Sequence, residues 1–236
     1  FFVSNAEFGT VDVLDGSDPD NLVHIASIPV GEVNHVRAKN GILAAAVGND
    51  DKQLPGTVQF FDTAALNKLS QVEVGVLPDM LIFTPDGKTI ITANEGEPND
   101  DYTVDPLGSV SFVDLGSGSL LDIIQVTDYN VITVDFSLFS ASPFLDELFK
   151  SAFRAEGGRF FGQIHDENGE FVRESTFAED IEPEYIAVSP DGQEAFVVCQ
   201  ENNLIAVFDI PSRSFHRAFG LGVKDHSIEG NGLDAS

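Results

Sequence analysis

One pattern recurs four times along the chain. Each copy begins with a small or polar residue, continues with alternating β-branched and apolar residues, and ends in an aspartate before a turn. The copies are GTVDVLDGSDP (9–19), GTVQFFDTAAL (56–66), GSVSFVDLGSG (108–118) and NNLIAVFDIPS (202–212). The alternation predicts half-buried strands, and each aspartate can accept hydrogen bonds from backbone amides in the turn that follows. The first three copies start 47 and 52 residues apart, and the fourth starts 94 residues after the third, which is about two periods.

A second motif joins two strand-like segments through a turn. PDMLIFTPDGKTIITANE (78–95) and PEYIAVSPDGQEAFVVCQ (183–200) match at a constant offset of 105 residues. Both hold a proline followed by an acid, an apolar run, Ser/Thr-Pro-Asp-Gly and a second apolar run. Proline suits the second position of a turn and glycine tolerates a positive φ, so Pro-Asp-Gly predicts a β-hairpin. A weaker copy, VNHVRAKNGILAAAVGND (33–50), has Asn-Gly at the turn.

Together the two motifs form a unit of four strands in about 47 residues, which is typical of one blade of a β-propeller. A β-sandwich would show short strands without this internal match. The sequence therefore predicts an all-β propeller of four-stranded blades, with material for about four blades once one insertion is set aside. Closed propellers commonly have more blades, so we expect residues 1–236 to form a single propeller domain or part of one.

Residues 128–178 interrupt the repeat, and within them residues 142–156 predict a helix. Ser142 can cap its first turn, Pro143 suits the first helical position, and a pair of glycines can end it. The apolar face of this segment comprises Phe144, Leu145, Leu148, Phe149, Ala152 and Phe153. Two interpretations stay open: a helix that packs on the rim of the propeller, or a lid or partner-docking helix.

The charge of the chain limits its partners. It carries 39 acidic and 12 basic residues, and its net charge of −27 disfavours nucleic acid and anionic membranes. No run of about 18 apolar residues occurs, so no membrane span is expected. The one cysteine, Cys199, lies in an apolar run and is expected to be a small buried residue. Because the chain begins at Phe1 without methionine, we interpret it as a mature or internal piece.

Three long segments resemble the choice-of-anchor I family. They are MLIFTPDGKTIITANEGEPNDDYTVDPLGSVSFVDL (80–115), EPEYIAVSPDGQEAFVVCQENNLIAVFDI (182–210) and LGVKDHSIEGNGLDAS (221–236). Members of that family are secreted or surface β-propeller proteins, also described as similar to a mesenchyme-specific cell-surface glycoprotein. The resemblance implies an extracytoplasmic propeller, which is extracellular, at the cell surface or periplasmic. It also implies an occasional junction with phosphatase-like, nucleotidase-like or phytase-like domains.

The chain departs from the family pattern in two ways. Family members are typically longer, and their pattern continues past the NGLDAS at which this sequence stops. Gly48 stands where the pattern usually has an acidic residue. The resemblance supplies no defined catalytic mechanism for the propeller itself.

The densest acidic loop is NEGEPNDDYTVDPLG (94–108). Its acids are Glu95, Glu97, Asp100, Asp101 and Asp105, and no Lys or Arg lies among them. Calcium takes about six to eight oxygen ligands, so these side chains predict a calcium site with calcium as the cofactor. A second acidic loop, GNDDKQLPG (48–56), holds the equivalent place in the preceding repeat, so both are expected on one face. The spacing does not match an EF-hand, and the alternative is a solvated loop on an acidic protein.

The C-terminal segment predicts a weaker metal site. Asp225, His226, Asn231 and Asp234 lie close together between glycines. The alternative is a glycine-rich turn whose Asp and Asn side chains bind backbone amides. Because no second histidine stands at ligand spacing, a transition-metal site is the less favoured interpretation.

Two acids follow proline at equivalent points of two repeats. Asp79 and Glu184 would begin the innermost strands of their blades, near the central channel. They could be paired carboxylates for acid–base chemistry, or they could order the inner loops by binding amides. The sequence holds no Gly-x-Ser-x-Gly, phosphate-cradling loop or Cys/His zinc spacing, so nucleophilic catalysis has no support.

The preferred function is a non-enzymatic extracytoplasmic propeller that serves as an adhesion, scaffold or protein-interaction module. Its partner would be another protein or the remainder of the same polypeptide, because an incomplete propeller leaves a sheet edge open. The alternative is a calcium-dependent phosphoesterase of phytase-like or phosphatase-like type. Scarce Lys and Arg near the acidic loops weigh against it, since phosphate binding uses cationic side chains. A structural subunit of a large assembly is a third possibility.

Overall fold

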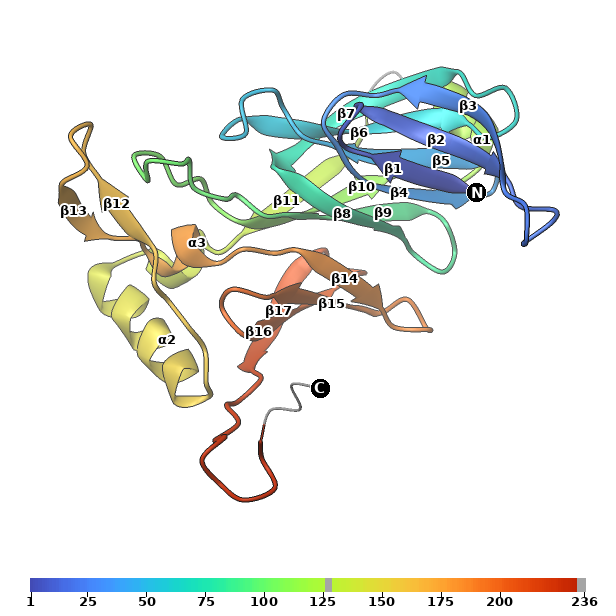
Figure 1. Ribbon diagram of the computed structural model, residues 1–236. Coiled ribbons are helices and arrows are strands. Elements are labelled where there is room, and N and C mark those ends of the chain that lie inside the picture. The colour runs from blue at the N-terminus through green and yellow to red at the C-terminus, as the bar shows by residue number, and fades with distance from the viewer. Residues whose placement is uncertain (126–128, 233–236) are drawn as a thin grey trace.

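The computed structural model describes residues 1–125 and 129–232, and its sheets follow one another along the chain (Figure 1). The first sheet comprises β1 (Phe2–Asn5), β2 (Thr10–Asp15) and β3 (Val23–Pro29). The second comprises β4 (Val33–Lys39), β5 (Ile42–Val47), β6 (Pro55–Asp62) and β7 (Lys68–Val76). The third comprises β8 (Pro78–Phe83), β9 (Thr89–Asn94), β10 (Ser109–Asp114) and β11 (Val131–Asp135). The fourth comprises β14 (Tyr185–Val188), β15 (Glu194–Cys199), β16 (Leu204–Asp209) and β17 (Ser214–Gly220).

The strands of each four-stranded sheet lie in chain order and pair antiparallel. The innermost strands lie side by side, β4 next to β8 and β8 next to β14. The first sheet has three strands in the described part of the chain, and its β2 is equivalent to the third strand of the other sheets. The prediction of an all-β fold built from repeated four-stranded sheets is therefore confirmed.

The repeated motifs form the turns that their residues predict. In the third sheet, Gly87 has a φ of 75°, and Asp86 accepts a hydrogen bond from the amide of Lys88 (3.1 Å). The fourth sheet repeats this turn, where Gly192 has a φ of 70°. The aspartates that end the other motif accept backbone amides as predicted: Asp15, Asp62, Asp114 and Asp209. Local sequence therefore fixes where each hairpin turns.

The core lies between the sheets and consists of apolar residues from facing strands. Val11 is buried between the first and second sheets, and Phe60 packs with Ile90 between the second and third. Phe112 and Phe208 lie between the third and fourth sheets, with ring centroids 6.3 Å apart. Cys199 belongs to this last cluster and is fully buried, and burial raises the pKa of its thiol. The cysteine is therefore a packing residue, as predicted.

The segment between the third and fourth sheets lies to one side of them (Figure 1). It comprises η1 (Ser137–Ser140), α2 (Pro143–Ala155), β12 (Gln163–His165), β13 (Phe171–Glu174) and α3 (Phe177–Asp180). Ser142 caps α2 by accepting the amide of Leu145 (3.3 Å), and Phe149 and Phe153 pack against the cluster between the third and fourth sheets. A short helix, α1 (Leu120–Gln125), follows the third strand of the third sheet. None of the helices in the described residues has the length and apolar character needed to cross a membrane.

Candidate functional site

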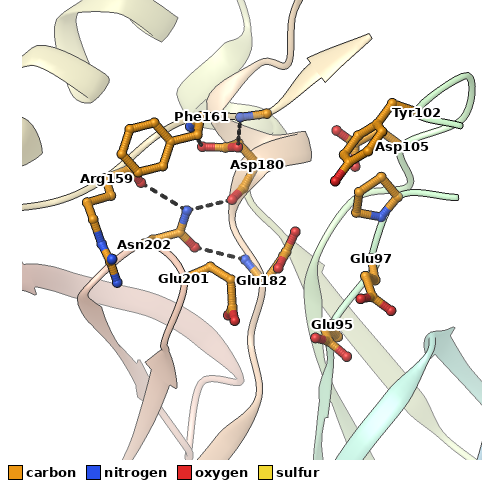
Figure 2. Close-up of a pocket in the computed structure, with 12 residues that line it drawn as sticks. Glu95, Glu97, Tyr102, Asp105, Arg159, Phe161, Asp180, Glu182, Glu201 and Asn202 are labelled. Carbon is orange, nitrogen blue, oxygen red and sulfur yellow. Dashed lines mark hydrogen bonds between the residues drawn. The ribbon is translucent and has the colours of Figure 1, made fainter. Parts of the chain in front are cut away.

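An acidic cavity of about 310 Å³ lies where the third and fourth sheets meet the insertion; we call it the mouth pocket. Its aromatic wall includes Tyr102 and Phe161, and Arg159 is the one Lys or Arg among its lining residues. The acids that line it are Glu95, Glu97, Asp105, Asp180, Glu182 and Glu201 (Figure 2). The six acids come from three separate stretches of the chain, and Arg159 and Phe161 come from a fourth.

Asn202 fixes one wall of the mouth pocket. Its side chain is 2% exposed and accepts a hydrogen bond from the amide of Glu182 (3.1 Å). It donates to the carbonyl oxygens of Arg159 (3.2 Å) and Asp180 (2.6 Å), as Figure 2 shows. The residue that opens the fourth copy of the repeat therefore ties the insertion to the fourth sheet, and places Asp180 and Glu182 beside Glu201.

Burial raises the pKa of several carboxyls around the mouth pocket. Burial, and then the charges of Glu97 and Asp79, raise the pKa of Glu95 to about 7. Burial, and then the charge of Glu201, raise the pKa of Glu182 to about 8. These groups hold protons close to neutral pH, because desolvation and like charges disfavour the ionised form. Carboxyls perturbed in this way and gathered in a cavity are typical of functional sites.

Two further acids of the pocket have raised pKa values for the same reason. Burial raises the pKa of Asp105 to about 6, although its Oδ2 accepts a hydrogen bond from Ser175 (2.6 Å). The other oxygen, Oδ1, is buried and has no hydrogen-bond partner among the described residues. Burial also raises the pKa of Asp180 to about 6, against the lowering effect of amides that donate to it.

A second acidic cavity, of about 720 Å³, lies between the two acidic loops; we call it the loop pocket. It is lined by Asp50 and Asp51 from one loop and by Asp100 and Asp101 from the other. The side-chain amide of Gln53 donates to the carbonyl oxygen of Glu97 (3.4 Å) across the two loops. The structure therefore brings the two loops together on one face, as predicted from their equivalent places in the repeat.

The five predicted calcium ligands divide between the two cavities. Glu95 and Asp105 line the mouth pocket, Asp100 and Asp101 line the loop pocket, and Glu97 lines both. Across residues 1–125 and 129–232, no group of three or more His, Cys, Asp or Glu side chains is arranged to hold a metal ion. Calcium binding thus stays a prediction that would need the loops to move together.

The predicted C-terminal metal site is dispersed where the structure describes it. Asp225 is exposed and accepts a hydrogen bond from the amide of Ser227 (2.9 Å), as in the alternative of a capped turn. His226 Nδ1 lies 2.6 Å from the carbonyl oxygen of Asn231. Asp234 lies outside the described residues.

Sequence reasoning singled out two residues beside the mouth pocket and missed three within it. Asp79 and Glu184 were placed near the central channel, and burial raises the pKa of both. Asp180, Glu182 and Glu201 were not singled out. The signal for Asp180 and Glu182 is the acid-rich AEDIEPE (178–184), which precedes the fourth sheet, but nothing local indicates that it faces the loop after β9. Glu201 has no such signal, because it stands alone in the turn between β15 and β16.

The comparisons with known proteins assign the family. A family model described as the choice-of-anchor I domain matches residues 1–236. The chain belongs to the choice-of-anchor I family. Membership implies association with the cell surface. A comparison with curated proteins found no matching sequence.

Solved structures show the fold of this choice-of-anchor I domain. The β-propeller domain of Myceliophteria thermophila Cps50 (Swd1) is similar with a TM-score of 0.56 and 9% identity, over 92% of this chain and 55% of that one. A putative 6-phosphogluconolactonase from Bacteroides uniformis is similar with a TM-score of 0.50 and 10% identity, over 94% of this chain and 51% of that one. The domain thus spans about half the length of these structures. Their likeness confirms the β-propeller fold, and family and fold together describe a surface or interaction β-propeller.

Proposed function

We propose that this domain is a non-enzymatic, extracytoplasmic interaction module that serves in adhesion or as a scaffold, outside the cell, at its surface or in the periplasm. The observation that carries the proposal is an apolar face of the fourth sheet that no other sheet within residues 1–125 and 129–232 covers. A row of four residues crosses that face, one from each strand in register: Tyr185, Val198, Ile205 and Phe219. Tyr185 is 51% exposed, Phe219 is 38% exposed, and the other two are partly exposed.

In the third sheet, the equivalent face is covered by the next sheet along the chain. Its equivalent row is Met80, Ala93, Val110 and Val134. Met80 is 1% exposed, and Ala93 and Val110 are fully buried, because the fourth sheet covers them. An apolar row of the same kind on the fourth sheet therefore fits a further β-sheet as its partner. That sheet would belong to a protein partner or to the remainder of the same polypeptide.

Sedimentation velocity over a range of protein concentrations tests the proposal. The exposed row should cause concentration-dependent association of the isolated domain, because buried apolar area is the main source of affinity in obligate interfaces. Phe219→Glu combined with Val198→Thr should weaken that association at least tenfold. Phe171→Glu is the matched control, because Phe171 is a 57% exposed aromatic on β13, away from the row. Association that persists in the double variant, or a wild-type domain that stays monomeric throughout, would remove the support for this face.

We also propose that calcium binds at the loop pocket, with Asp100 and Asp101 from one loop and Asp50 and Asp51 from the other. The support is the approach of two oxygen-rich loops on one face, since calcium is held by carboxylate and amide oxygens. Among the described residues, Lys52 is the one Lys or Arg that lines this cavity. Neither cavity has the several cations that a phosphate group requires, so the geometry does not favour the phosphoesterase alternative.

Thermal unfolding in EDTA, in millimolar calcium and in millimolar magnesium tests the ion. A ligand that binds only the folded state at about 100 times its Kd stabilises it by about 2.7 kcal/mol, so calcium should raise the midpoint. Asp100→Asn with Asp101→Asn should abolish the rise, whereas Glu167→Gln with Glu170→Gln, exposed acids of the β12–β13 turn, should preserve it. Equal midpoints in calcium and EDTA would show that these loops are solvated.

A further inference from the structure

The first sheet has a free side, opposite the side that packs on the second sheet. Val11 and Val13 of β2 are buried against the second sheet. Asp12 and Leu14 alternate with them, so they lie on the free side. In the described part of the chain, no other sheet packs there. The first and fourth sheets therefore end the series of sheets, each with one free face (Figure 1).

The free face of the first sheet carries a polar network centred on Asp12. Its carboxylate accepts hydrogen bonds from Asn5 (2.9 Å), Thr10 (3.2 Å) and Ser27 (2.6 Å). His24 Nε2 lies 3.7 Å from the same carboxylate. Both oxygens of Asp12 thus have partners within the sheet, so a surface that covers this face would leave neither of them unpaired.

This network is the counterpart of one that is buried in the third sheet. Asn94 pairs with the first residue of the third strand of its sheet, as Asn5 does. Asn94 donates a hydrogen bond to Ser111 (2.9 Å), which holds the place of Asp12. Asn94 and Ser111 are fully buried, and the second sheet lies against Asn94. A face of this kind is therefore one that a preceding sheet covers, and on the first sheet it is open to solvent.

A glycine at the end of the outer strand marks where two successive sheets meet. Gly75, on β7, lies against Asn94 of the third sheet. Gly31, which follows β3, lies against Val47, the residue of the second sheet that corresponds to Asn94. The third sheet differs, because its outer strand leads into the insertion. Each of the two direct junctions thus places a glycine against the residue that corresponds to Asn5.

Gly222 holds the same place at the end of the fourth sheet. The amide of Leu221, just before it, donates to the carbonyl oxygen of Asn203 (3.0 Å). In the first sheet the corresponding bond runs from Val30 to Gly9 (2.9 Å). Gly222 and its counterpart in the first sheet both have a positive φ, 73° and 98°. A β-carbon at Gly222 would meet no described atom within 4 Å, so this glycine is free to lie against a further sheet.

The second sheet shows that an apolar face can cover such a polar network. Val58, on β6, is fully buried between the second and third sheets, and Ile205 of the exposed row holds the corresponding place in the fourth sheet. The first sheet adds an apolar cavity of about 400 Å³, whose lining includes Val3, Leu14 and Leu22. Val3 is 44% exposed and Leu22 is 53% exposed. The two free faces thus complement each other as the second and third sheets do.

The number of sheets fits a pair of copies. The chain covers 55% of the β-propeller domain of Cps50 (Swd1), so its four sheets correspond to about half of that fold. Because the two free faces lie at opposite ends of the series, each copy offers both halves of the contact to another copy. Two copies would supply eight sheets, four from each, and propellers typically have about four to eight blades.

We propose that two copies of this domain pair head to tail, with the first sheet of each copy on the fourth sheet of the other. The pairing closes a two-fold ring of sheets, in which Gly222 of one copy lies against the partner's Asn5. This inference rests on the proposed function, because it uses the free face of the fourth sheet and names what covers it. The net charge of −27 on each copy opposes the pairing, so salt should strengthen it.

Sedimentation velocity in about 1 M salt, where the screening length is about 3 Å, tests the pairing. The wild-type domain should form dimers as its concentration rises, and no larger species. Val3→Glu with Leu22→Glu should weaken the pairing at least tenfold, because every interface needs one first sheet. Ser27→Arg, at an exposed position of the same face, should do so without altering an apolar residue. Phe171→Glu, on β13, should leave the pairing unchanged.

A mixing experiment shows which faces meet. The first-sheet variant (Val3→Glu with Leu22→Glu) and the fourth-sheet variant (Phe219→Glu with Val198→Thr) should each stay monomeric alone. Their equimolar mixture should associate at least tenfold more tightly than either variant alone, because one copy keeps an intact first sheet and the other an intact fourth sheet.

Two outcomes would overturn the head-to-tail ring and leave the free face of the fourth sheet as an interaction site. The first is pairing at wild-type strength in both the glutamate variant and Ser27→Arg, which would mean that two fourth sheets meet each other. The second is a wild-type species that keeps growing with concentration, which would mean an open chain of copies. A mixture that stays monomeric would overturn the pairing of unlike faces.

Discussion

The third and fourth sheets are built on the same motif, yet the faces they turn toward the preceding sheet are filled in opposite ways. In the third sheet a row of paired residues on β9, β10 and β11 is polar: Thr92, Ser111 and Thr133. In the fourth sheet the equivalent row on β15, β16 and β17 is apolar: Val197, Ala206 and Ala218. The next position repeats the contrast, since Asn94 pairs with Ser109, whereas Cys199 pairs with Leu204.

The polar residues of β9 and β10 are buried and satisfied, whereas Thr133 on β11 is exposed. Asn94 accepts a hydrogen bond from Thr92 (2.9 Å) and donates to Ser109 (3.2 Å) and Ser111 (2.9 Å). The Ser111 and Thr133 hydroxyls are 2.8 Å apart. Gly75 on β7 lies against this network, where a β-carbon would collide with Asn94 and Ser109. The same four-stranded sheet can therefore bury either a hydrogen-bond network or apolar side chains. The polar network requires a glycine on the neighbouring strand, because a larger residue at Gly75 would collide with it.

The largest effect on stability should come from the two faces that point away from the preceding sheet. That face is covered by the fourth sheet in the third sheet, and it is free in the fourth sheet. Ile91 is fully buried beneath the fourth sheet, so Ile91→Ala should reduce the free energy of unfolding by about 2–5 kcal/mol. Phe196, at the equivalent place, is only partly buried, so Phe196→Ala should cost about half as much or less, although it removes more atoms. Urea unfolding at low protein concentration measures both. Equal costs would mean that the free face is covered in solution.

The polar network should give the next largest effect. Asn94→Ala leaves buried hydroxyls without this partner, at a cost of about 1–3 kcal/mol for each group left unsatisfied. Copying the fourth sheet with Thr92→Val, Asn94→Cys and Ser111→Ala should be milder than the single substitution, because both partners of most bonds are removed together. Urea unfolding compares the two variants. If the triple variant were the less stable one, the hydrogen bonds of the network would themselves add to the free energy of unfolding, beyond avoiding unpaired buried groups.

Local sequence predicted the repeated architecture because its determinants are local. Pro-Asp-Gly sets the hairpins at Gly87 and Gly192, and the aspartates after each strand bind the amides of their own turns. The polar filling of the third sheet could not be recognised in this way. Thr92 and Ser111 alternate with apolar residues as in any half-buried strand. Only their full burial in the structure, with Gly75 packed against the neighbouring Asn94 and Ser109, shows that both faces of the sheet are covered.

The candidate site was predicted in part. The two acidic loops do meet, because repetition of the blade places equivalent loops side by side. The mouth pocket was not foreseen as a whole, since Glu182 and Glu201 become neighbours only through the path of the insertion and the bonds of Asn202. The predicted calcium site rested on the number of acids within one loop of the sequence. The acids whose pKa values are raised come instead from two places, the loop after β9 and the segment before β14, because burial depends on how the third and fourth sheets pack.

The smallest effect concerns the aspartates that end the repeated strand. Asp114, in the third sheet, receives a hydrogen bond from Arg213 (2.9 Å), which holds its pKa below the ordinary value of 3.8. Asp209, in the fourth sheet, has a lowered pKa through its bonds to Ser212. Arg213→Ala should therefore raise the pKa of Asp114 and leave that of Asp209 unchanged, as measured by carbon-detected NMR titration.

The cost of Arg213→Ala should stay below about 1 kcal/mol at pH 7, because the ion pair is partly exposed to water. A depressed pKa contributes stability above the ordinary value near 3.8 and loses it as the pH falls through the folded value. The difference between wild type and variant should therefore shrink as the pH falls below about 4, where Asp114 takes up its proton. A difference that is constant down to pH 2 would mean that Arg213 joins the third and fourth sheets through its packing rather than its charge.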